Sequence, residues 1–293
     1  MKISADMVRQ LRERTGAGMM ECKKALVAAE GDLEVASENL RKAGIAKADK
    51  KAGRVAAEGV IAAAVTDDGK RGVLVEVNSE TDFVGNGDDF RGFASTVAKI
   101  ALDLGGEDVD AVSSATFDDG KTVDEARREL TARVGENITV RRVAVVESGG
   151  TIAHYSHGGR IGVLVAYEGG DAELGQDLAM HVAAAQPQYL DESAVPADQL
   201  AKEREILIAQ AEGSGKPANI IEKMVEGRLR KFLGEITLLG QPFVKDPDMS
   251  VKKLVSNAKA SVSAYRRFEV GEGIDKGGDD FAAEVAALSG GGS

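Results

Sequence analysis

The stretch that decides the fold is Lys70–Ala101, KRGVLVEVNSETDFVGNGDDFRGFASTVAKIA, because a second stretch parallels it: Arg160–Ala185, RIGVLVAYEGGDAELGQDLAMHVAAA. Each has Gly-Val-Leu-Val from its third residue, continues through a polar loop that contains glycine, and ends in apolar residues at helical spacing. Each copy also follows a shorter apolar run and a tight turn, as in a β-hairpin. The sequence therefore predicts two related α+β subdomains with antiparallel sheets.

The loop after the strand is where the two copies differ most. The first copy has Ser79–Gly85 where the second has Gly169-Gly170-Asp171. Shared parts of a repeated unit indicate scaffold, so the differing loop is the candidate for function. Phe83 stands out within it, because the chain has only 8 Phe, 4 Tyr and no Trp. From its position alone, Phe83 is either a core residue that caps the sheet or an exposed functional residue.

The remaining segments predict an α+β protein with helical additions. Residues 4–43 have the apolar spacing of three short helices, with Ser4 as the N-cap of the first and Asp32 as that of the third, and such a bundle resembles the ubiquitin-associated type. Pro196–Glu212 and Pro217–Leu233 predict an antiparallel helical hairpin. We expect four parts: 1–54, a UBA-like helical domain and basic linker; 55–140, the first core subdomain; 141–272, the second core subdomain with a helical hairpin insert at 190–233; and 273–293, a C-terminal helical module (Asp279–Leu288) with a flexible tail.

Charge and composition exclude several classes of protein. The net charge is −11, but residues 1–54 hold 12 Lys/Arg against 8 Asp/Glu, so this part carries +4 and the rest −15. An acidic chain is a poor nucleic-acid binder, and we expect none. The basic stretch 41–54 is either a solvated helix or linker or a docking surface for an acidic protein patch. A single Cys, no membrane-length apolar run and no targeting pattern predict a cytoplasmic protein without membrane contact.

Signatures of catalysis and of metal or cofactor binding are absent. Asp118–Thr122 (DDGKT) ends like a phosphate loop, but Ala115 stands where the leading glycine belongs. The chain has three histidines and one cysteine, and Cys22 falls on the inward face of a short helix. We therefore expect no enzyme activity, no metal and no cofactor.

Two further stretches carry a family resemblance: Leu11–Leu26, LRERTGAGMMECKKAL, and Glu76–Val84, EVNSETDFV. They resemble the two hallmarks of bacterial translation elongation factor Ts. The resemblance extends over nearly the whole chain, through KKAGRVAAEGVI, GENITVRRVA, HGGRIGVLVA, AMHVAA, SGKPANIIEKMVEGRLRKF, GQPFV and FEVGEGI. One departure follows the second hallmark, where Gly85-Asn86-Gly87 replaces a small and then a basic residue; we expect it to loosen the loop.

The family resemblance implies a function. Members of this family are non-enzymatic guanine-nucleotide exchange factors that bind elongation factor Tu in its GDP-bound and nucleotide-free forms. The loop in their second hallmark stretch disturbs the magnesium and phosphate region of the partner through an Asp-Phe pair. Asp82 and Phe83 match that pair here, flanked by Thr81 and Val84.

The same resemblance implies further contacts with the partner. The matching positions are Arg12, Met19, Met20, Val134, His157 and Val244. From the residues alone, Met20 could instead belong to the core of the small domain, and His157 could be a turn residue without function. Lys245 stands where the family often has Met, which predicts a more polar contact beside Val244.

Alternatives from other classes stay open at this point. One is an adaptor for ubiquitin-like proteins, suggested by the N-terminal bundle alone. Another is a small-molecule enzyme with its site in a cleft between the subdomains. Weak RNA binding through residues 41–54 is a third. The helical hairpin could join two copies of the chain, pack on its own core or contact the partner.

Overall fold

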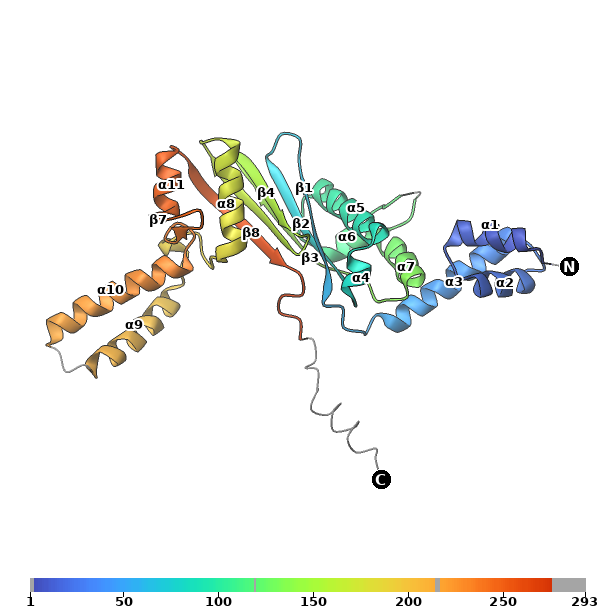
Figure 1. Ribbon diagram of the computed structural model, residues 1–293, viewed down its shortest axis with the longest axis horizontal. Coiled ribbons are helices and arrows are strands. Elements are labelled where there is room, and N and C mark those ends of the chain that lie inside the picture. The colour runs from blue at the N-terminus through green and yellow to red at the C-terminus, as the bar shows by residue number, and fades with distance from the viewer. Residues whose placement is uncertain (1–2, 119, 214–216, 276–293) are drawn as a thin grey trace, which may run out of the picture.

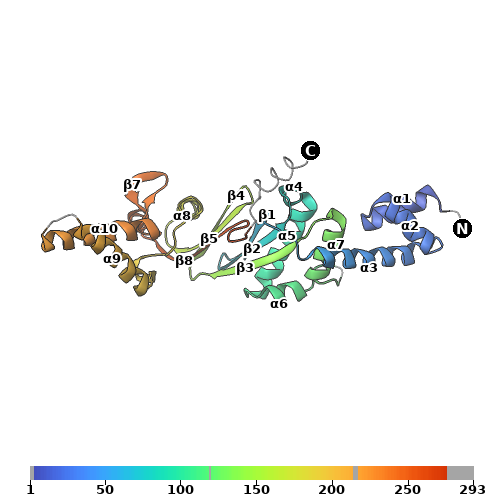
Figure 2. The ribbon, with the colours of Figure 1, turned by 90° about the horizontal axis from the view of Figure 1, so that it is seen from below.

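A computed structural model describes residues 3–118, 120–213 and 217–275. The molecule is elongated: a helical bundle lies at one end, a helical hairpin at the other, and two antiparallel sheets between them (Figure 1). Figure 2 shows the same order from below. The mixed, antiparallel α+β architecture expected from the sequence is confirmed. The predicted C-terminal helix, Asp279–Leu288, lies outside the described residues.

Three helices form the N-terminal bundle: α1 (Ala5–Thr15), α2 (Met19–Ala28) and α3 (Leu33–Lys51). Ser4 accepts a hydrogen bond from the Met7 amide and Asp32 accepts from two amides of α3, so both act as the N-caps that the sequence predicted. Leu11, Cys22 and Leu26 are fully buried in the small core that the helices share. Cys22 is thus a buried thiol on an inward face.

The basic stretch is mostly helix rather than linker, because α3 runs on to Lys51. This second half of α3 packs against α7 (Val123–Val134), with Ala48 buried between them. Several of its cations have partners within the chain: Lys42 pairs with Glu38, and Lys51 donates to the Gly135 carbonyl at the end of α7. The stretch therefore connects the bundle to the rest of the molecule as a helix, and its use as a docking surface for an acidic protein patch stays a prediction.

Each predicted copy forms a hairpin covered by a helix, and each sheet gains a third strand from farther along the chain. The first sheet is β1 (Glu58–Val65), β2 (Arg71–Ser79) and β3 (Thr139–Glu147), covered by α5 (Asp88–Leu104). The second is β4 (Thr151–His157), β5 (Ile161–Glu168) and β8 (Ser261–Glu269), covered by α8 (Ala172–Ala185). The predicted boundary at 140/141 falls inside β3, which pairs with β2, so it is placed too early.

The glycine that opens each Gly-Val-Leu-Val copy lies where the two sheets pack together. A Cβ on Gly162 would lie 2.4 Å from Ile61 Cγ2 and 3.2 Å from Leu74 Cδ2, and one on Gly72 would lie 3.2 Å from Leu164. Leu74 and Leu164, the leucines of the two copies, are fully buried in the shared core between the sheets. The repeated motif therefore supplies a matched pair: each copy's glycine receives the other copy's leucine.

Gly162→Ala is expected to lower the free energy of unfolding by about 1–3 kcal/mol, because the added methyl group overfills the core between the sheets. Gly92→Ala is the control, since a Cβ there meets nothing within 4 Å and α5 gains a better helix former. Urea unfolding of both variants measures the difference. Equal stability of the two variants would show that the sheets do not need this close approach.

The second copy carries the inserted hairpin that the sequence predicted. It consists of a short turn η1 (Glu192–Ala194), α9 (Ala197–Glu212) and α10 (Ala218–Ile236), and α9 packs on α10 around Leu207, Ala211 and Val225. The chain returns through β6 (Pro242–Phe243), β7 (Asp246–Ser250) and α11 (Val251–Asn257). Among the helices that the structure describes, none is both long enough and apolar enough to cross a bilayer. Self-association through the hairpin stays a prediction.

Candidate functional site

The segment between the first sheet and α5 is a single helical turn, α4 (Asp82–Gly85), rather than the loop that we predicted. Thr81 caps it, because its Oγ1 accepts a hydrogen bond from the Val84 amide. Val84 faces inward and is buried, whereas the neighbouring Phe83 is 86% exposed. The core alternative for Phe83 is therefore wrong. Exposed on a connection between a sheet and a helix, Phe83 is a candidate contact residue.

Hydrogen bonds from the loop after α7 hold this turn in place. Glu136 accepts from Thr81 twice, from the backbone N–H at 2.9 Å and from the hydroxyl at 2.7 Å. Glu80 accepts from the Asn137 amide at 2.6 Å. Ser79 donates to the Thr81 carbonyl at 2.8 Å. The residues that precede Phe83 are thus fixed from two sides, while the ring itself is free.

Glu136→Gln is expected to loosen α4 without unfolding the protein. The amide keeps one acceptor for Thr81 and loses the other, which is worth about 0.5–1.5 kcal/mol locally. Amide hydrogen exchange of residues 82–86 should therefore become roughly 2- to 10-fold faster, with an unchanged thermal midpoint. Exchange at the parent rate would contradict the role of Glu136.

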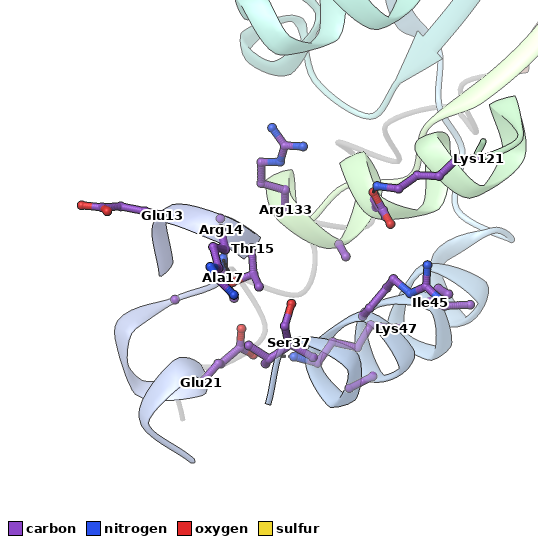
Figure 3. A pocket seen from close by; sticks show the side chains of 18 residues that line it. Glu13, Arg14, Thr15, Ala17, Glu21, Ser37, Ile45, Lys47, Lys121 and Arg133 are labelled. Carbon is purple, nitrogen blue, oxygen red and sulfur yellow. Dashed lines mark hydrogen bonds and ion pairs between the residues drawn. The ribbon is translucent and has the colours of Figure 1, made fainter. Parts of the chain in front are cut away.

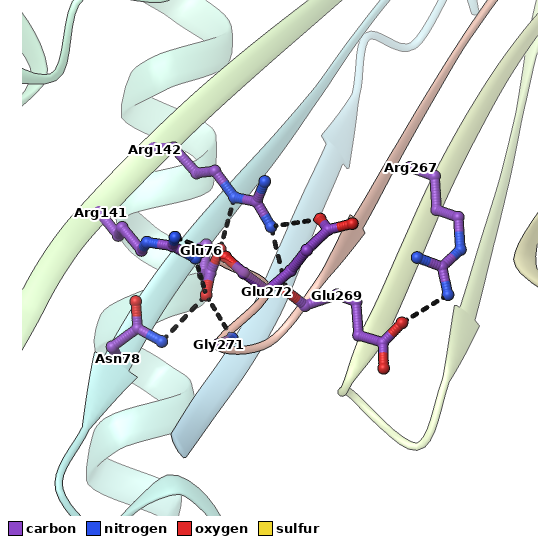
Figure 4. Close-up of polar contacts among 8 residues, drawn as sticks. All are labelled: Glu76, Asn78, Arg141, Arg142, Arg267, Glu269, Gly271 and Glu272. Atoms are coloured by element: carbon purple, nitrogen blue, oxygen red, sulfur yellow. Dashed lines mark hydrogen bonds and ion pairs between the residues drawn. The ribbon is translucent and has the colours of Figure 1, made fainter. Parts of the chain in front are cut away.

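A buried carboxylate lies in the strand that leads to α4. Glu76 is fully buried and accepts hydrogen bonds from Arg142 Nε at 2.5 Å, Arg141 Nη1 at 3.0 Å and the Gly271 amide at 2.8 Å (Figure 4). Asn78 donates to the same carboxylate at 3.0 Å and to the Glu58 carbonyl at 3.1 Å. The cluster joins β1, β2 and β3 to the turn after β8, and so fixes the base from which α4 projects.

The Glu76 cluster also makes stability depend on acid. Burial by itself would raise the pKa of the Glu76 carboxyl, but hydrogen bonds from the Gly271 amide, Asn78 and Arg142 outweigh it and hold the pKa below its ordinary value of 4.5. The unfolded chain then binds more protons, so this stabilisation is complete above that value and is lost as the pH falls through the folded pKa. The urea midpoint of the parent should fall more steeply below about pH 5 than that of Glu76→Gln; parallel profiles would contradict this.

The residues that depart from the family pattern have specific contacts. Gly85 is buried against Gly59, and Asn86 accepts a hydrogen bond from Arg91 at 2.8 Å. A Cβ at Gly85 would lie 3.2 Å from Gly59 Cα, so the glycine allows α4 to approach the start of β1 closely. Our expectation that this segment is loosened gains no support from these contacts.

The turn that contains His157 lies along the same start of β1. The Ile61 amide donates to the Gly159 carbonyl at 2.8 Å, and Arg160 pairs with Glu58 at 2.5 Å. His157 is exposed, with Nδ1 3.2 Å from the Tyr155 hydroxyl. Thus α4, through Gly85, and this turn, through Gly159 and Arg160, both contact the first residues of β1.

The other predicted contact residues lie farther apart. Arg12, Met19 and Met20 are exposed on the bundle, with Met20 64% exposed, so the core alternative for Met20 is wrong. Val134 is half-buried against the first core, two residues before Glu136. Val244 is 40% exposed at the opposite, α8 side of the second sheet. The candidate surface therefore has a central part around α4 and separate parts on the bundle and beside α8.

A cavity of about 470 Å³ separates the bundle from α7 (Figure 3). Its lining includes no His or Cys, and its charged side chains are largely paired: Lys47 with Glu21, Lys121 with Glu129 and Arg133 with Asp89. The space between the two sheets, where the enzyme alternative required a cleft, is filled by the shared apolar core. Neither place brings together the groups of an acid–base or nucleophilic site.

Comparison with known proteins decides the family. The model of the family described as Elongation factor TS matches residues 80–272. The chain belongs to the elongation factor Ts family. Curated elongation factor Ts proteins are similar over nearly the whole length: that of Halorhodospira halophila is 59% identical over 287 residues, covering 98% of each chain. That of Methylococcus capsulatus is 60% identical over 288 residues, again covering 98% of each.

The recognition made from the two hallmark stretches is thus confirmed, and elongation factor Ts membership gives the chain a role in translation elongation. The supporting residues of α4 were missed in the sequence. Glu76 left a signal, since it is the one charged residue in an otherwise apolar run, Val73–Val77. Helix α7, which ends just before Glu136, left another, because Thr122 and Glu125 form a capping box.

Proposed function

We propose that this chain binds elongation factor Tu in its GDP-bound and nucleotide-free forms and promotes release of GDP, so that GTP can be reloaded during elongation in the cytoplasm. The observation that supports this most is the exposed ring of Phe83 on a turn whose two preceding residues, Glu80 and Thr81, are held by hydrogen bonds to Asn137 and Glu136. The α4 turn, with Asp82 and Phe83, enters the partner near the site of magnesium and phosphate.

The proposed action is mechanical and electrostatic. A Phe ring that leaves water for an apolar slot contributes about 1.5–3 kcal/mol, provided that the turn does not have to be ordered on binding. The hydrogen bonds of Glu136 and Glu80 already order the turn in the free protein. Asp82, a carboxylate beside the ring, disfavours the phosphate groups of the nucleotide by like-charge repulsion. No acid, base or nucleophile of this chain is needed.

Remaining contacts supply binding energy away from the nucleotide. Exposed Met19 and Met20 suit an adaptable apolar contact on the bundle. Arg12, Val134, His157 and Val244 are the further positions that we assign to the partner. These residues are spread over the bundle, the strand end at β1 and the α8 side. Their contacts keep the factor bound while Phe83 disturbs the nucleotide site of the partner.

Equilibrium binding tests the proposal. By linkage, any loss of GDP affinity caused by the factor equals the loss of factor affinity caused by GDP. Titration of immobilised elongation factor Tu should therefore show tighter binding to the nucleotide-free form than to the GDP form, by about 10-fold or more. An adaptor without exchange activity would bind both forms equally, and that result would contradict the proposal.

A further inference from the structure

A second buried titratable side chain lies far from α4. His181, on α8, is fully buried, and both of its ring nitrogens have partners. Nε2 is 3.0 Å from Gln241 Oε1, and Nδ1 accepts the backbone N–H of Val244 at 3.2 Å. Since Nδ1 accepts, the imidazole is neutral and carries its proton on Nε2, which donates to Gln241.

The orientation of Gln241 supports this assignment. Its Nε2 donates to the Ala185 carbonyl at 3.2 Å and to the Glu235 carbonyl at 2.8 Å, so its oxygen must face His181. Burial lowers the pKa of the His181 imidazole, and the hydrogen bond to Gln241 opposes that effect only in part. The neutral ring that Val244 requires is therefore the stable form near neutral pH.

Helix α8 also holds both neighbours of Val244. Asp177, one turn before His181, pairs with Lys245 at 2.5 Å. Phe243 is buried, and its ring centroid is 5.9 Å from that of His181. Lys245 is thus engaged within the chain rather than adding a free charge beside the contact. Between these two anchors, the Val244 side chain is the part that remains exposed.

We propose that His181 is a positioning residue for the contact made by Val244: its neutral imidazole fixes the Val244 backbone so that the side chain projects toward an apolar surface of the partner. Two stretches that carry the family resemblance, AMHVAA and GQPFV, are joined by this hydrogen bond. The inference deepens the proposed function and relies on it for the identity of the partner, elongation factor Tu. That His181 holds Val244 is a property of the free chain.

Two variants of His181 separate positioning from packing. His181→Asn can present Oδ1 where Nδ1 lies and so keep an acceptor for Val244, whereas His181→Leu fills similar space without an acceptor. Both variants leave Gln241 without its imidazole partner, so they are matched in that respect. His154→Gln, which removes an exposed histidine on β4, is the control for the loss of any histidine.

Two readouts are measured. In the free protein, amide exchange at Val244 should be about 3- to 10-fold faster in His181→Leu than in the parent, and largely restored in His181→Asn. Dissociation from nucleotide-free elongation factor Tu should be faster by a similar factor in His181→Leu and restored in the same way. If the effect passes through Val244, adding His181→Leu to Val244→Ala should change dissociation no further.

The outcomes are distinguishable. Parent-like amide exchange at Val244 in His181→Leu overturns the positioning role whatever the partner does. Faster amide exchange with additive effects of His181→Leu and Val244→Ala on dissociation, or no effect of Val244→Ala, overturns the contact. A parent that does not bind elongation factor Tu defeats the proposed function and the contact together, while the exchange data still report whether His181 holds Val244.

Discussion

Phe83→Ala is expected to slow factor-stimulated GDP release from elongation factor Tu by about 10- to 100-fold at saturating factor. The estimate is the transfer free energy of one Phe ring, about 1.5–3 kcal/mol, expressed as a rate. Since the ring is 86% exposed, its removal takes little from the packing of the free protein, and thermal unfolding should be unchanged. The rate is read by stopped flow with a fluorescent GDP analogue.

Leu104→Ala is the matched control for Phe83→Ala. Leu104 is also a large apolar side chain, 50% exposed, but it lies at the far end of α5 from α4. Its truncation should leave release at the parent rate. Equal effects of the two substitutions would mean that general surface hydrophobicity, not the α4 turn, drives exchange. If Phe83→Ala stimulates GDP release as fast as the parent, Asp82 or the contacts away from α4 must cause the release instead.

Glu76→Ala is expected to be strongly destabilising, by about 3–5 kcal/mol, because it removes the one buried carboxylate on which four donors converge. Arg141, Arg142, Asn78 and the Gly271 amide all donate to this one carboxylate. Urea unfolding measures the loss. If the variant remains folded, it should also bind elongation factor Tu with a less ordered α4.

Glu147→Ala provides the comparison for Glu76→Ala. Glu147 also accepts from an arginine, Arg71, at 2.8 Å, but its side chain is 66% exposed. An exposed pair of this kind is worth less than about 1 kcal/mol, so the two glutamates should differ by several-fold in cost. Similar costs would show that the Glu76 cluster does not stabilise the junction between β2, β3 and the turn after β8.

The parts of the fold predicted from sequence are those set by local patterns. The Gly-Val-Leu-Val strands, the caps at Ser4 and Asp32, and the helix that ends each copy follow from residues within a few positions of each other. The third strand of the first sheet was not predicted. β3 joins β2 from about 65 residues away, and a strand pattern does not name its neighbour.

The site shows the same division. Asp82 and Phe83 could be named because a hallmark stretch contains them, but whether Phe83 is buried or exposed depends on contacts across the chain. Glu136 lies 55 residues from Thr81, and Gly271 lies 195 residues from Glu76. Hydrophobicity alone predicts burial of a Phe ring. It is the polar residues before Phe83, held by distant partners, that leave it facing solvent.

The most direct test of the central claim is release of a fluorescent GDP analogue from elongation factor Tu, followed by stopped flow as the concentration of this chain is raised. The account predicts that the release rate rises with concentration and saturates far above the intrinsic rate, with no turnover of nucleotide by this chain alone. A release rate that stays at the intrinsic value, at concentrations where binding to elongation factor Tu is complete, would contradict it.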